Sequence, residues 1–242
     1  MAGSKKIIIK DEVDEFEKRK SGVAYPREEA WDICHKVFVE AIGRKNKDID
    51  GIVLGGKIVD SIVIGNNIIR GGKLKAEDYD YLALHLYAYL ASYGMVCRRT
   101  ILIRHNYRCL IDVVKIICEL KYAFLLDIDI YAGSFSKYKY IDTVLELKEN
   151  IEKALAPYGN VTDTLISKIL LGTLACVPAY DTNLKKALKD LGYKASFDRK
   201  GLESLLTFAE DYKADIQAAM NETGYPAIKI IDIALWEYGS KI

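Results

Sequence analysis

Apolar residues recur at the spacing of an α-helix along most of this chain, and that periodicity limits the folds open to it. From Arg27 to Gly43 the apolar side chains fall at positions i, i+3, i+4 and i+7, which gives one wide face suited to burial. The four prolines lie near the boundaries of such segments. The pattern therefore predicts an all-α fold.

Other segments share this period, and we expect helices over residues 78–92, 107–120, 140–155, 161–175, 182–191, 200–221 and 226–238. Segment 78–92 is apolar around most of its circumference and is followed by Gly94, which predicts a central, capped helix. Residues 49–69 are ambiguous, because their Ile and Val content favours strands whereas their spacing favours a helix. We expect a helix there.

The length and composition indicate a globular chain with a sizeable core. Half of the 242 residues are apolar, which is enough to bury a large interior. No repeat or long linker separates domains, so we expect one compact multi-helix domain over residues 1–242. A division into helical subdomains 1–132 and 133–242 at the loop Asp127–Lys139 is the alternative.

Charge and cysteine content limit the cellular compartments and the classes of binding partner that we expect. The 35 Lys and Arg nearly balance the 34 Asp and Glu, so no global basic field indicates a nucleic-acid binder, although a local patch stays open. The five cysteines include no CxxC pair, and no apolar stretch reaches the length of a signal peptide core or membrane span. We expect a cytoplasmic protein without a membrane span.

The three histidines lack metal-ligand spacing, so we expect no metal or cofactor.

The segment Gly51–Ile58 (GIVLGGKI) meets the phosphate-binding pattern GxxxxGK[ST] except at its last position. Ile58 stands where a hydroxyl would hold magnesium, and the charged residues 44–50 do not resemble the buried strand that precedes such a loop. We interpret the segment as a glycine-interrupted apolar helix or turn.

A basic cluster follows the helix expected at 78–92. Arg98, Arg99 and Arg104 lie close to Tyr107, and arginines bind phosphate bidentately while an aromatic ring can stack on a base. With Lys185 on a later helix, these residues form a candidate nucleic-acid site. An exposed surface paired with local carboxylates has the same composition.

The corner Val177–Thr182 (VPAYDT) is the sharpest candidate for chemistry. Pro178 disfavours helix in the residues before it, and Asp181 stands where a carboxylate can cap the helix expected at 182–191. Capping explains the pattern by itself. If the same carboxylate also faced a groove, it could position a water molecule or stabilise a developing cation.

The run Lys168…Val177-Pro178-Ala179-Tyr180-Asp181-Thr182…Lys185-Lys186…Leu191-Gly192 resembles the catalytic stretch of the helix-hairpin-helix DNA glycosylases. The resemblance implies that Asp181 is catalytic and that Lys168 is a nucleophile on the preceding helix. Segments 81–95, 168–181 and 225–239 are similar to an uncharacterised all-helical family of bacterial cytosolic proteins, which implies a shared fold and no activity.

Two functional hypotheses follow. In the first, the chain is a DNA- or nucleotide-associated protein that holds an extruded base near Asp181 and phosphates near Arg98, Arg99 and Lys185. In the second, it is a non-enzymatic interaction or structural protein that binds a protein partner or forms a homo-oligomer, and Asp181 is only a helix cap.

Overall fold

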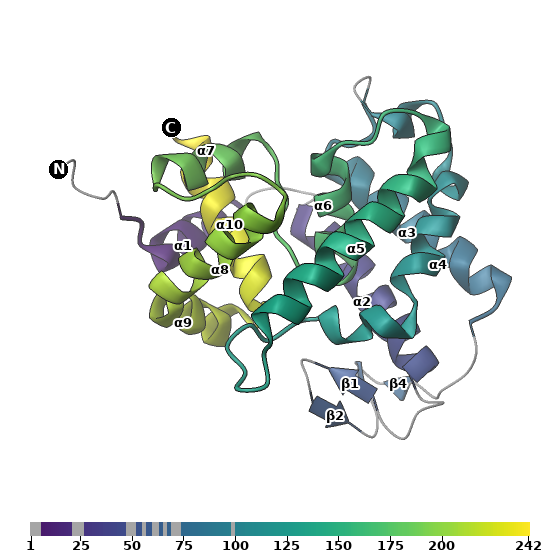
Figure 1. The fold of residues 1–242 in the computed structure, drawn as a ribbon, viewed down its shortest axis with the longest axis horizontal. Helices are drawn as coiled ribbons and strands as arrows, with labels where there is room; N and C mark the ends of the chain where they lie inside the picture. The colour runs from purple at the N-terminus through teal and green to yellow at the C-terminus, as the bar shows by residue number, and fades with distance from the viewer. Residues whose placement is uncertain are drawn as a thin grey trace. The chain divides into compact units, whose positions relative to one another are not determined.

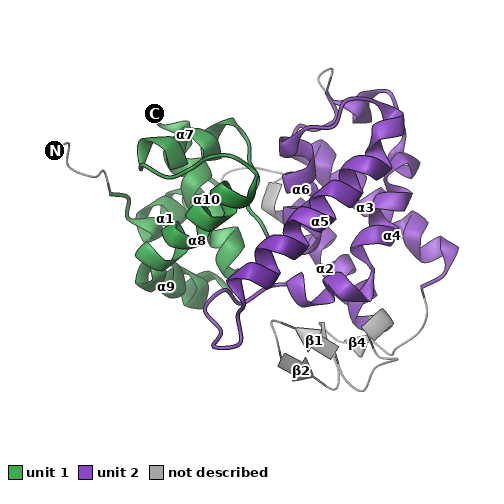
Figure 2. Ribbon diagram, viewed as in Figure 1, with its two compact units in different colours: residues 1–26, 177–242 green, residues 27–176 purple. Residues whose placement is uncertain are grey.

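The computed structural model describes residues 6–20, 27–46, 74–97 and 100–242, together with four short strands between residues 52 and 68. The chain divides into two compact units, one made of residues 1–26 and 177–242 and the other of residues 27–176 (Figure 2). We call them unit 1 and unit 2. This division differs from the one expected at residue 132, because the helix that follows residue 136 packs on other helices of unit 2.

Unit 2 is built around a buried helix, α6, which contacts α2, α3 and α5 (Figure 1). Every residue of α6 from Leu165 to Thr173 is buried. The α-helices of the unit are α2 (Arg27–Asn46), α3 (Ala76–Ser92), α4 (Ile111–Ile117), α5 (Lys137–Leu155) and α6 (Asp163–Thr173). Short 3-10 helices join them at η1 (Ile101–Ile103), η2 (Tyr107–Leu110), η3 (Leu120–Leu125) and η4 (Ala156–Tyr158).

Unit 1 is built around α10, whose residues are buried on nearly every side. Its helices are α1 (Ile9–Lys20), α7 (Thr182–Asp190), α8 (Arg199–Asp211), α9 (Lys213–Thr223) and α10 (Ala227–Ser240). Helix α10 packs against α1, α7 and α9, so the first and last helices of the chain share one core. Helices carry the core of both units, which confirms the all-α class.

Two helix predictions in unit 1 need correction. The single helix expected over 200–221 is broken at Tyr212, whose backbone leaves helical dihedrals while its ring stays packed on Phe208 at 4.7 Å. Helix α1 was not expected, because most of its residues are charged and its apolar stripe is short. Among its described side chains, Ile9 and Val13 are the buried ones.

The helix expected over residues 49–69 is also wrong. The described residues there form two antiparallel hairpins, β1 (Ile52–Leu54) with β2 (Lys57–Val59) and β3 (Val63–Ile64) with β4 (Asn67–Ile68). The sequence between the paired strands is Gly-Gly and then Gly-Asn, and both dipeptides favour two-residue hairpin connections. Lys57 begins a strand where a phosphate-binding loop would continue into a helix. The three glycines of segment 51–58 lie outside the described residues.

Helix α3 is less central than its apolar composition predicts. Leu82, Leu86 and Leu90 are buried, but Tyr81 is 53% exposed and Leu84 is 47% exposed. The central helix of unit 2 is therefore α6, which is buried from Leu165 to Thr173. Helix α3 has an apolar side that the described structure leaves uncovered. No described helix is long and apolar enough to cross a bilayer.

The contact between α3 and α6 depends on a glycine. A Cβ placed at Gly172 would lie 2.2 Å from Cε1 of Tyr89, whereas a Cβ at Gly133 would meet nothing within 4 Å. We expect Gly172→Ala to lower the free energy of unfolding by about 1–3 kcal/mol through overpacking, despite the better helix propensity of alanine.

Gly133→Ala is the matched control and should change that free energy by less than about 0.5 kcal/mol. Urea denaturation followed by circular dichroism measures both variants. Equal stabilities of the two variants would show that the ring of Tyr89 moves aside without cost.

Candidate functional site

The Asp181 carboxylate caps helix α7. Oδ1 of Asp181 accepts hydrogen bonds from the backbone N of Asn183 at 3.0 Å and of Leu184 at 3.1 Å. The backbone of Asp181 is extended, as an N-cap residue requires, and its side chain is partly buried. Leu184 is fully buried, as the apolar stripe of this helix predicts. The capping role expected from the sequence is confirmed.

A buried ion pair on α10 supports this corner. The backbone N of Ala179 donates to Oδ1 of Asp232 at 2.8 Å, and the backbone N of Asp181 donates to the carbonyl of Ala179 at 2.7 Å. Nζ of Lys229 lies 3.8 Å from Oδ2 of Asp232, and Lys229 is 1% exposed. Sequence reasoning missed this pair, although a lysine and an aspartate three residues apart in an apolar helix were a visible signal.

Lys168 occupies a buried position and not an exposed one. It is 8% exposed, and Nζ donates to the carbonyl of Tyr93 at 3.0 Å while lying 5.7 Å from the centre of the Tyr93 ring. Tyr93 is the C-cap of α3, where a cation is favoured by the unpaired carbonyls and the helix dipole. Lys168 belongs to unit 2 and Asp181 to unit 1.

The predicted phosphate-binding residues are also divided between the units. Arg104 is exposed at the end of η1 in unit 2, whereas Lys185 is partly exposed on α7 in unit 1. Arg98 and Arg99 lie outside the described residues. The nearby Arg108 pairs with a local carboxylate, since Nε lies 3.4 Å from Oδ1 of Asp80.

Polar side chains cover the C-terminal end of α6. Trp31 Nε1 donates to Leu171 O at 2.9 Å, Asp127 N donates to Leu174 O at 3.0 Å, and His35 Nδ1 lies 2.9 Å from Thr173 O. The second ring nitrogen of His35, Nε2, lies 2.9 Å from Oδ1 of Asp127. Because a carbonyl only accepts, Nδ1 of His35 carries a proton. Both ring nitrogens are therefore engaged in holding the end of a buried helix.

Two fully buried cysteines, Cys34 and Cys176, are not activated as nucleophiles. Burial raises the pKa of the Cys34 and Cys176 thiols well above the usual range, so both stay protonated. Both side chains act as small apolar groups in unit 2.

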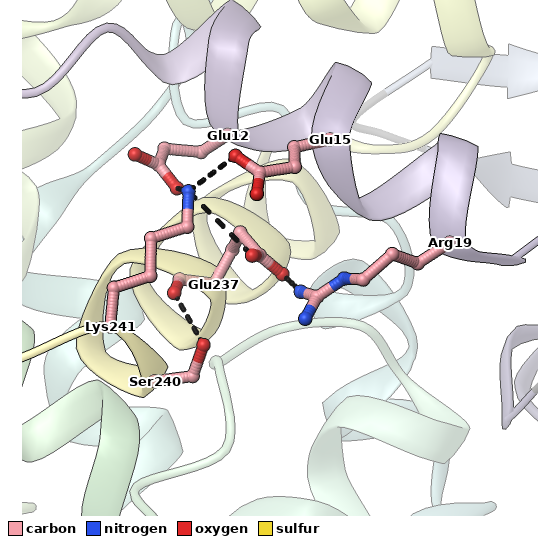
Figure 3. A network of polar contacts seen from close by, with 6 residues as sticks. All are labelled: Glu12, Glu15, Arg19, Glu237, Ser240 and Lys241. Atoms are coloured by element: carbon pink, nitrogen blue, oxygen red, sulfur yellow. Dashed lines mark hydrogen bonds and ion pairs between the residues drawn. The ribbon is translucent and has the colours of Figure 1, made fainter.

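Charged side chains from α1 and α10 meet around one ammonium group (Figure 3). Nζ of Lys241 lies 2.7 Å from Oε2 of Glu12, 2.6 Å from Oε2 of Glu15 and 3.7 Å from Oε1 of Glu237. Arg19 reaches the other oxygen of Glu237 from the opposite side (Figure 3). We call these five residues the α1–α10 ion network.

Glu237 makes this network costly to disrupt. Its side chain is fully buried, and neither carboxylate oxygen accepts a hydrogen bond from the described residues, so its charge is balanced by ion pairs alone. The hydrogen bond from Lys241 lowers the pKa of Glu15. Burial by itself would lower the pKa of Lys241, but hydrogen bonds to Glu12 and Glu15 raise it on balance.

The same carboxylates are the group among the described residues with the geometry of a metal site. One oxygen from each of Glu12, Glu15 and Glu237 lies within 4.8 Å of the others, and carboxylate oxygens suit Ca²⁺ or Mg²⁺. The ammonium of Lys241 already lies among them, so a metal ion would have to displace it. Sequence reasoning missed the cluster because its members come from opposite ends of the sequence. The spacings of Glu12 to Glu15 and Glu237 to Lys241 were its only local signals.

Capping by Asp181 leads to a test of its role. We expect Asp181→Ala to destabilise the protein by about 0.5–2 kcal/mol, because two helix amides lose their acceptor. Asp181→Asn should keep a free energy of unfolding close to the wild-type value, since asparagine caps as well as aspartate does. Thermal and urea unfolding measure the two variants. A large loss in Asp181→Asn would mean that the negative charge, and not the cap, is what the site requires.

The ion network leads to a pH-dependent prediction. Lys241→Met should lower the melting temperature near neutral pH, because Glu12, Glu15 and Glu237 lose their shared cation. The folded-state pKa of Glu15 is lowered, so this contribution is present above the ordinary carboxyl pKa and is lost as the pH falls through the lowered value. The difference from wild type should therefore shrink in acid.

The matched control is Lys10→Met, which breaks a half-exposed ion pair with Glu222 in the same unit. Circular dichroism melts between pH 3 and pH 8 compare the two variants. A pH-independent loss in Lys241→Met, or an equal loss in Lys10→Met, would contradict the network's role.

No protein-family model, curated protein or solved structure matches this chain. The resemblance of residues 168–192 to DNA glycosylases therefore stays a prediction based on those residues alone. In this structure the two side chains singled out for catalysis, Asp181 and Lys168, hold helix ends.

Proposed function

We propose that this chain is a non-enzymatic interaction protein whose contact surface is the outer side of α3. The observation that carries the proposal is a stripe of apolar side chains exposed along that helix. Tyr81, Leu84, Ala88 and Ala91 are all exposed and follow one another at intervals of three, four and three residues. We call these four residues the α3 outer face.

The spacing of the α3 outer face suits a second helix. Intervals of three and four residues are those of the a and d positions that meet in paired helices. The two alanines leave room for close approach, while Tyr81 and Leu84 provide large apolar groups. Tyr81 is held in place by His85, whose ring lies 4.2 Å away and whose Nδ1 lies 3.0 Å from the Tyr81 carbonyl. The partner that fits is an α-helix with its own apolar stripe.

The engagement of the candidate catalytic residues supports the same proposal. Asp181 caps α7 and Lys168 binds the end of α3, so each has a structural task. A DNA- or nucleotide-associated role stays a hypothesis, and its described residues Arg104 and Lys185 come from different units. A cytoplasmic location is part of our proposal, because none of the five cysteines forms a disulfide bond.

A designed helical peptide tests the α3 outer face. The probe is a hydrocarbon-stapled designed helix that is unrelated in sequence to this chain, with leucine at its a positions, alanine at its d positions and polar residues elsewhere, so that only one side is apolar. We expect binding with a dissociation constant on the order of 10–100 µM, measured by fluorescence anisotropy. Leu84→Glu in the protein should weaken binding at least about tenfold, because a carboxylate would be buried against apolar groups.

The matched control is Tyr138→Glu, which changes a side chain that is 73% exposed on α5 of the same unit. It should leave peptide binding unchanged. Absence of binding by the wild type at about 1 mM peptide, or equal effects of the two substitutions, would overturn the proposal.

A further inference from the structure

We infer that the helix that binds the α3 outer face is α3 of a second copy of this chain, packed antiparallel across a two-fold axis. The inference rests on the proposed function and adds the identity of the partner. Three features of α3 carry it: the order of its large and small side chains, the position of its charges and the size of its apolar stripe.

The stripe is complementary to itself when reversed. In an antiparallel pair, an a position of one helix lies opposite a d position of the other. Centring the axis midway between Leu84 and Ala88 places Leu84 against Ala88 of the other copy. The same axis places Tyr81 against Ala91 of the other copy. Each large side chain then meets a small one, which lets the two helix backbones approach closely.

The charges of α3 favour the antiparallel arrangement. Its first turn carries Glu77 and Asp78, and its last turn carries no basic residue. Parallel packing would bring the two acidic turns together, whereas antiparallel packing separates them by the helix length of about 25 Å and opposes the helix dipoles. Asp80 is already paired within its own chain, with the hydroxyl of Tyr107 at 2.9 Å and Nε of Arg108 at 3.4 Å. A two-fold contact of this kind is isologous, as in most dimers.

The stripe is small for a permanent dimer. One helix face with four apolar residues contributes less than the roughly 800 Å² per partner found in stable complexes. We therefore expect reversible association with a dissociation constant on the order of 10–100 µM. The fraction of dimer should therefore change over the micromolar concentrations at which sedimentation is measured.

The experiment combines sedimentation velocity with hydroxyl-radical footprinting of the full chain from 1 µM to 500 µM. We expect a shift from monomer to dimer, together with protection of Tyr81 and Leu84 that grows with concentration. Tyr138 is the internal control and should react equally throughout. Leu84→Lys and Ala88→Glu should each weaken association at least tenfold. An equimolar mixture of the two variants should regain part of it, because the ammonium introduced in one copy meets the carboxylate introduced in the other.

The outcomes separate this inference from the proposed function. If the chain stays monomeric and Tyr81 and Leu84 react at every concentration, the inference that the partner is a second copy is overturned. The α3 outer face then stays open to another helical partner. A monomer in which both side chains are protected at every concentration overturns both, because the chain itself covers the face. Dimerisation without protection of α3, or without recovery in the mixture, overturns the proposed packing.

Discussion

Each unit depends on the burial of one helix on nearly all sides, and such a helix needs protein partners for every polar group it takes out of water. In unit 2 the helix is α6, whose terminal carbonyls meet the side chains of Trp31 and His35. In unit 1 it is α10, whose buried Asp232 and Glu237 meet an amide and cationic groups. The polar side chains of the interior thus allow these two helices to be buried.

This constraint explains why the candidate catalytic residues have structural tasks. A lysine and an aspartate beside a proline corner have the composition of an active site, but Lys168 neutralises a helix C-terminus and Asp181 supplies a helix N-cap. Their proximity in sequence spans the boundary between two units. The surface that we propose for partner binding is instead the outer side of α3, where Tyr81 and Leu84 are exposed.

Most of the α-helices could be predicted from the sequence because an apolar face at 3.6-residue spacing is a local signal. Asp181 was likewise identifiable as a cap, since a carboxylate acceptor acts on amides only two and three residues away. The burial of Lys168 was not, because the carbonyl it binds lies 75 residues earlier in the chain. The α1–α10 ion network depends on residues at opposite ends of the sequence for the same reason. The hairpins at 52–68 could have been predicted from the sequence, because Gly-Gly and Gly-Asn stand between short β-branched runs.

The order of the units along the chain has a consequence for synthesis on the ribosome. Unit 2 is one continuous segment, so all its contacts are available once residue 176 has emerged. Unit 1 takes helix α1 from before that segment and α7 to α10 from after it. The nascent α1 must therefore wait, with Ile9 and Val13 uncovered by α10, through the translation of about 200 residues. The many charged residues of α1 keep this segment hydrated until α10 is made. This explains why the helix at this place in the chain has so few apolar residues.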